Sequence, residues 1–134
     1  PFVSLVYFTV KDGKRMSPGM QIQVTPDPVE RERHGSILGT VVSISEYPVT
    51  LSEAWKAVGN REVAETLIAG GYRMQVVAEL ESDPETFSRF RWSSSRGPEL
   101  RITAGTTTTA RVAVERRAPI TFVLPFLRSS AGID

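Results

Sequence analysis

Apolar and polar residues alternate with a period of two along much of the chain, which is typical of β-strands that bury one face. The clearest case spans residues 73–81, where one parity is apolar, the other is polar, and Val77 is the one exception. Similar alternation covers residues 20–25, 36–46 and 106–117. The pattern predicts a mainly β domain whose sheet has one wet face.

The first segment is apolar on both parities. Residues 2–10 are rich in β-branched and aromatic side chains, with no polar face. Such a run predicts a strand that is buried on both sides.

Glycines mark special backbone positions around the predicted strands. Pro18 and Gly19 stand directly before the strand at 20–25. Proline presets φ near about −65°, and glycine accepts the positive φ of a type II turn, so we expect this pair to be the structural turn into that strand. Gly39, inside the strand at 36–46, indicates either a bulge or the close approach of a neighbouring backbone.

Residues 50–71 carry the signals of helices. Thr50 and Glu53 match a capping box, Asn60 is a second N-cap candidate, and glycines follow each predicted helix. We predict a helical insertion over this segment. Trp55 is on the apolar face of its first helix, where a core anchor is favoured over an exposed interface hot spot.

A long polar segment follows the strand at 73–81. Residues 82–100 contain prolines, glycine and three consecutive serines, which predicts a loop. Its aromatic residues Phe87, Phe90 and Trp92 are expected to lie on the core.

The last apolar segment fits a strand or a helix. Residues 119–128 are apolar all round. Because Pro119 suits the first position of a helix, we predict a short C-terminal helix. A frayed tail is expected over residues 129–134.

Composition limits the domain count and the partners. The 134 residues suit one domain, and 16 basic against 15 acidic residues leave a net charge of +1, too little to recruit nucleic acid or anionic lipid. The sequence has no cysteine, which excludes disulfides and thiolate zinc sites. It also lacks the run of about 20 apolar residues that spans a bilayer. Since the chain starts at Pro1 inside an apolar run, we expect it to be a fragment.

Catalytic and metal-binding patterns are not found in the sequence. His34 is the only histidine, it stands in a charged segment, and no G-x-S-x-G motif accompanies it. The spacings of calcium loops and zinc helices are missing too. Glu79 and Glu81 fit a solvated sheet face better than an acid/base pair. We therefore predict a protein that is not an enzyme and that uses no cofactor or metal.

One segment alternates arginines with aromatic residues: Arg89, Phe90, Arg91, Trp92, Arg96 and Arg101. This pattern suits single-stranded nucleic acid, which stacks on rings and contacts cations. The interpretation favoured by the net charge is a loop whose rings cover the core and whose arginines stay wet. The residues proposed for an interaction surface are Trp55, Arg89, Arg91, Trp92 and Arg96.

Five motifs occur in order and carry a family resemblance: MSPGMQIQV at 16–24, GSILGTV at 35–41, SEYPVT at 45–50, RWSSS at 91–95 and RAPI at 117–120. Together they resemble the C-terminal part of haemolysin D-like membrane fusion proteins, closest to the secretion protein of NHLP (nitrile hydratase leader peptide) bacteriocin export systems. The resemblance covers nearly the whole chain. Ser17 stands where the family's turn usually has lysine.

The resemblance implies a small antiparallel β-barrel of a periplasmic adaptor, with residues 50–71 as its helical insertion. Such adaptors form rings on an ABC exporter, sometimes one with a peptidase domain, and are anchored in the inner membrane by an N-terminal segment. The barrel lies on the extracytoplasmic side, and the family supplies no catalytic residues. The alternative function is a barrel that binds single-stranded nucleic acid or peptide through residues 87–101.

Overall fold

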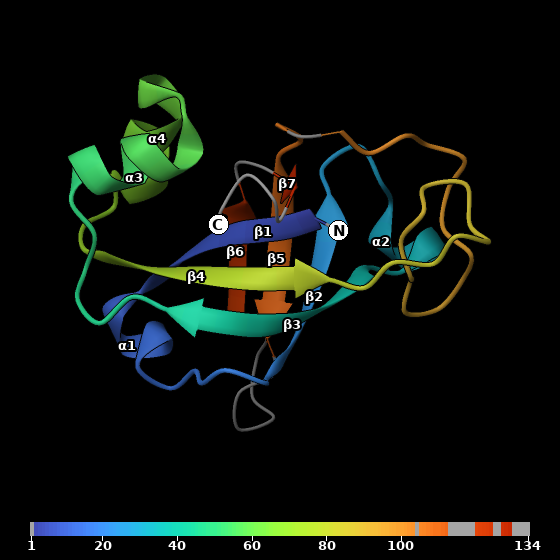
Figure 1. The fold of residues 1–134 in the computed structure, drawn as a ribbon, viewed down its shortest axis with the longest axis horizontal. Helices are drawn as coiled ribbons and strands as arrows, with labels where there is room; N and C mark the ends of the chain where they lie inside the picture. The colour runs from blue at the N-terminus through green and yellow to red at the C-terminus, as the bar shows by residue number, and fades with distance from the viewer. Residues whose placement is uncertain (1, 104, 113–119, 125–126, 130–134) are drawn as a thin grey trace.

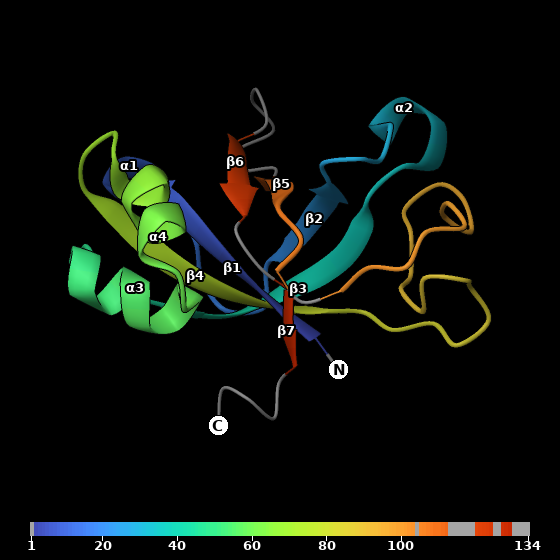
Figure 2. The same ribbon diagram turned by 90° about the horizontal axis from the view of Figure 1, so that it is seen from above.

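The predicted strands pair into one antiparallel sheet. The computed structural model describes residues 2–103, 105–112, 120–124 and 127–129. Within these ranges seven strands pair in the order β6-β5-β2-β3-β4-β1-β7. Their bounds are Phe2–Thr9 (β1), Gln21–Pro26 (β2), Ile37–Ile44 (β3), Arg73–Leu80 (β4), Thr108–Val112 (β5), Ile120–Leu124 (β6) and Leu127–Ser129 (β7). The sheet curls into a nearly closed barrel, which confirms the predicted fold class (Figure 1, Figure 2).

The helical insertion is confirmed as two helices, α3 (Leu51–Val58) and α4 (Arg61–Ile68). At the start of α3 the Glu53 amide donates to Thr50 Oγ1 over 3.1 Å, and the Thr50 amide donates to Glu53 Oε1 over 2.8 Å. Asn60 caps α4 in the same manner, accepting from the Val63 amide over 3.0 Å. These bonds satisfy amides that have no partner within the helix, which fixes where each helix begins.

Two further helices have a single turn each. They are α1 (Val10–Gly13) and α2 (Arg31–His34). The Asp12 amide donates to Thr9 Oγ1 over 3.2 Å, so the hydroxyl that ends β1 also begins α1. In α2 all four side chains are polar, and none of them is fully buried. No hydrophobic periodicity marks helices this short.

The main core fills the inside of the barrel with the apolar parity of each long strand. Strand β4 keeps the predicted alternation, with Met74, Val76, Ala78 and Leu80 buried. Val76, Ala78 and Leu80 belong to the main core together with side chains of β1, β2, β3 and β5: Val6, Phe8, Ile22, Val24, Ile37, Val41, Ala110 and Val112. Burial of this surface is the main source of the barrel's stability.

A second core lies outside the barrel, between its wall and α3–α4 (Figure 2). Its buried members are Leu5, Tyr7, Ala54, Val58 and Ala64. Tyr7 donates its hydroxyl to Gln75 Oε1 over 2.7 Å. Val77, the exception in the alternation of β4, packs against this core. The expectation that the first strand is buried on both faces is therefore confirmed, with the helices as the second cover.

Strand β3 contains a bulge, although not at Gly39. Val41 pairs with Ala78 and Ser43 pairs with Val77, so Val42 is the extra residue. Gly39 shows the other predicted feature, close approach, because a Cβ there would lie 3.1 Å from the carbonyl oxygen of Glu79.

The predicted C-terminal helix is wrong for the part of that segment that the structure describes. Residues 120–124 form β6 and pair with β5, and residues 127–129 form β7 and pair with β1. Pairing to an open strand edge satisfies a row of backbone groups, which outweighs the local preference of Pro119. Pro119 itself, residues 113–117 of the predicted strand 106–117, and the predicted tail from 130 onward lie outside the described residues.

The turn at Pro18-Gly19 is confirmed. The Met20 amide donates to the Ser17 carbonyl over 3.2 Å, and Gly19 has φ of 95°. The Gly19 amide also donates to the Val41 carbonyl over 2.8 Å, which ties the turn to β3. The pair therefore sets the direction in which the chain enters β2.

Substituting Gly19 with valine is expected to lower the free energy of unfolding by about 1–3 kcal/mol, because a β-branched residue resists positive φ. Chemical denaturation of the chain measures this. Gly19→Asn is the matched control, since asparagine tolerates the left-handed region and is expected to lose less. Equal stability of Gly19→Val and the parent would contradict the role of the turn.

Candidate functional site

The sequence-predicted interaction residues lie at two ends of the molecule. Trp55 belongs to α3, at the end where α3 and α4 cover the barrel (Figure 1). The loop of residues 81–103 extends beside α2 at the other end (Figure 1). The structure therefore does not bring Trp55 together with Arg89, Arg91, Trp92 and Arg96, and the two regions are separate candidate surfaces.

In the loop, two of the three aromatic side chains lie on the core as expected. Phe90 and Trp92 are only 3% and 5% exposed. The Trp92 indole Nε1 donates to Ser88 Oγ over 2.9 Å, and Phe90 meets the ring of Phe2 edge-on at 5.6 Å. Phe87 is the correction, because 59% of it is exposed. Phe90 and Trp92 are thus part of the main core and present no face on which a base can stack.

The loop arginines stay wet, and two of them have partners. Arg91 forms an ion pair with Glu81 at 3.4 Å, and Arg96 donates to the Glu85 carbonyl over 2.6 Å. Arg89 has φ of 73°, a backbone conformation that is uncommon without glycine. Arg89 and Arg101 line a cavity of about 560 Å³ beside Phe87. The groups of this loop that could contact a ligand are therefore the exposed ring of Phe87 and the guanidinium groups of Arg89 and Arg101.

The helical end presents exposed aromatic side chains. Trp55 is 44% exposed, which makes the favoured prediction of a core anchor wrong, and the Arg61 guanidinium lies 5.2 Å from the centre of its ring. Tyr47 and Tyr72, at 75% and 79% exposed, flank the insertion in sequence. The Val49 amide donates to the Arg73 carbonyl over 2.9 Å, so both flanks meet at this end of the barrel. We name Tyr47, Trp55 and Tyr72 the aromatic end.

Metal-ligating side chains do not cluster in the described part of the chain. Across residues 2–103, 105–112, 120–124 and 127–129, no three His, Asp or Glu side chains gather as a metal site would require. His34 lies in α2, and its carbonyl accepts from the Ser95 hydroxyl over 2.7 Å. In the same ranges no helix has the length and apolarity to cross a bilayer.

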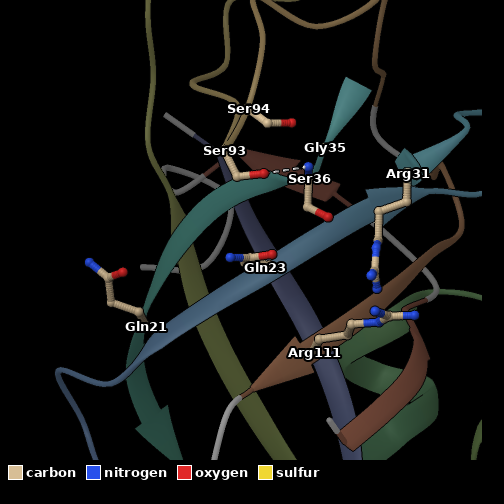
Figure 3. Close-up of a pocket in the computed structure, with 8 residues that line it drawn as sticks. All are labelled: Gln21, Gln23, Arg31, Gly35, Ser36, Ser93, Ser94 and Arg111. Atoms are coloured by element: carbon tan, nitrogen blue, oxygen red, sulfur yellow. Dashed lines mark hydrogen bonds between the residues drawn. The ribbon is translucent and has the colours of Figure 1, made fainter. Parts of the chain in front are cut away.

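A polar pocket that sequence reasoning missed lies between β2, α2, the start of β3 and the loop (Figure 3). Its volume is about 480 Å³. The lining residues are Gln21, Gln23, Arg31, Gly35, Ser36, Ser93, Ser94 and Arg111. No sequence motif joins Arg31 to Arg111, because Arg31 lies in α2 and Arg111 is placed beside β2 by the pairing of β2 with β5. The glycine before β3 and the run of three serines are the only local signals.

Comparison with known proteins adds no relative: no family model, curated protein or solved structure matches the chain.

Proposed function

We propose that this chain is the β-barrel domain of an adaptor, or membrane fusion, subunit in an ABC-type system that exports a peptide or bacteriocin. The domain acts without catalysis, by assembling side by side with copies of itself in the full-length protein and by contacting the exporter. In this proposal the full-length protein is anchored in the inner membrane and the barrel lies on the extracytoplasmic side.

The observation that carries the proposal is the aromatic end. The helical insertion stands between β3 and β4, which are neighbours in the sheet, and packs on the barrel wall through the second core. It therefore holds Trp55 on a rigid support, and Arg61 stacks on one face of the ring. Exposed tryptophan and tyrosine side chains in fixed positions are typical of the hot spots of protein interfaces.

The family motifs at 16–24 and 91–95 lie in the described residues and support the proposal. The family implies a barrel with a helical insertion at 50–71, and both are present here. The turn motif at 16–24 includes the tight turn at Pro18-Gly19. The RWSSS motif at 91–95 includes Trp92, which is buried in the barrel core. Each of these segments has a structural role in building the barrel, as an adaptor without catalysis requires.

The alternative, a module that binds single-stranded nucleic acid or peptide through residues 87–101, has less support. Its stacking rings would be Phe90 and Trp92, which are buried. The adaptor proposal needs no rearrangement of the loop. Titration with labelled single-stranded DNA at two salt concentrations separates the two functions, because phosphate contacts weaken steeply with salt.

The adaptor proposal predicts that Trp55→Ala weakens association with the exporter by about tenfold or more, as loss of a hot-spot tryptophan does. The measurement is co-purification of the full-length protein with an ABC exporter produced in the same cells, together with the amount of peptide exported. Lys56→Ala, an exposed neighbour on the same helix, is the matched control and is expected to leave both unchanged. Full association and export with Trp55→Ala would refute the aromatic end as the contact.

A point substitution is the sharper test because deletion of residues 50–71 has a second effect. Removing the helices would uncover Leu5 and Tyr7, which are now buried against them. Loss of export after deletion would then report a misfolded barrel as readily as a lost contact.

A further inference from the structure

The polar pocket holds two guanidinium groups at its mouth. Arg111 stands on β5 directly opposite Gln23 of β2, and Arg31 comes from α2. In Figure 3 the two guanidinium groups point toward one another, and both also line the adjoining cavity. Arginine stays protonated at neutral pH, so two positive charges face each other across the rim.

Neither guanidinium forms an ion pair with a carboxylate in the described part of the chain, where the ion pairs found involve other residues. Three acidic residues, Asp27, Glu30 and Glu32, line the adjoining cavity and not this pocket. Asp27 accepts a hydrogen bond from the Thr107 hydroxyl over 2.6 Å. The pocket itself is lined only by cationic and neutral polar side chains and one glycine. Like charges at short range repel, and an anion between them removes that repulsion.

On the opposite side of the pocket, hydrogen bonds to Ser36 hold Ser93 in place, and its hydroxyl group lines the pocket. Ser93 accepts from the Ser36 amide through its Oγ over 3.0 Å, and its own amide donates to the Ser36 carbonyl over 2.8 Å. The Ser93 hydroxyl hydrogen is left to donate elsewhere. Gly35 has φ of 79°, and a Cβ there would collide with the hydroxyl oxygens of Ser93 and Ser94. The glycine therefore allows both serines to lie close against the strand.

We propose that this pocket is an oxyanion-binding site whose best-fitting ligand is a phosphate group on a small molecule. A phosphate has enough acceptor oxygens for two guanidinium forks and for the serine hydroxyls, and arginine pairs with it in bidentate geometry. The volume of about 480 Å³ leaves room for an organic body next to the Gln21 and Gln23 amides. This site is separate from the aromatic end and does not depend on the adaptor role.

The test is a titration of the isotope-labelled chain with inorganic phosphate, followed by NMR at constant ionic strength. We expect saturable shifts of the amides of residues 31–36, 93–94 and 111. Arg111→Gln and Arg31→Gln are each expected to weaken binding by about tenfold or more, the value of one lost charge-assisted hydrogen bond. Acetate is the second probe, and weaker binding of acetate than of phosphate is expected because it offers fewer acceptors.

Arg33→Gln is the matched control, since Arg33 shares α2 and is exposed but does not line the pocket. It is expected to bind phosphate as the parent does. Shifts that stay linear with phosphate, or an equal loss in Arg33→Gln, would overturn the proposal, since either result means general charge screening. Should Arg111→Gln disturb the barrel, Arg31→Gln on the surface helix still decides the outcome. Tighter binding of acetate than of phosphate would overturn the assignment to phosphate.

Discussion

Replacing Trp92 with alanine is expected to lower the free energy of unfolding by about 3–5 kcal/mol, the range found when a buried aromatic side chain is truncated. Trp92 is 5% exposed and belongs to the main core, although it comes from a loop. Truncation also strips Ser88 Oγ of its indole donor. Urea denaturation followed by circular dichroism measures the loss.

Phe87→Ala is the control for this substitution, because it removes a ring from the same loop that is 59% exposed. It is expected to change stability by less than about 1 kcal/mol. A Trp92→Ala variant as stable as Phe87→Ala would show that the loop does not close the barrel.

A second large effect is expected from Ala64→Asp, which places a charge in the second core. Ala64 is a fully buried residue of α4 and packs among the hydrophobic side chains of the second core. An unpaired buried carboxylate costs more than about 3 kcal/mol, so α3 and α4 are expected to detach from the barrel wall. Because the main core is separate, strands β2 and β3 are expected to keep their structure.

Hydrogen exchange resolved by segment distinguishes these outcomes. In Ala64→Asp the amides of residues 51–68 are expected to lose protection while those of β2 and β3 retain it. Thr66→Asp, on the exposed side of the same helix, is the control and is expected to change stability by less than about 1 kcal/mol. Loss of protection throughout the chain would mean that the two cores unfold as one unit.

The sequence correctly predicted the features that depend on residues close together in the chain, namely a strand, two helix starts and a turn. The alternation at 73–81 correctly predicted strand β4, because the inward residues of this strand pack in one continuous core. The Thr50 capping box and the Asn60 cap correctly predicted where the two insertion helices begin, because each cap bond joins residues only three positions apart. Gly19 correctly predicted the turn, because the positive φ that the turn needs depends on the type of a single residue.

Features that depend on distant pairing were not predictable in this way. Residues 120–124 read as apolar all round, and their strand conformation comes from pairing with β5. Trp55 sits on a face that looks apolar in sequence, yet the core closes over Ala54 and Val58 and leaves the ring outside. The polar pocket is lined by Arg31 of α2 and by Arg111, which the register of β5 against β2 places opposite Gln23. No spacing in the sequence encodes that register.

The bulge at Val42 reverses the phase of β3. Before it the odd-numbered Ile37 and Val41 face the main core, and after it the even-numbered Ile44 packs there. The chain therefore leaves β3 turned by half a strand period, and Val42 itself, 50% exposed, is left outside the barrel. A single extra residue therefore lets both ends of β3 place an apolar side chain on the main core, Ile37 before the bulge and Ile44 after it.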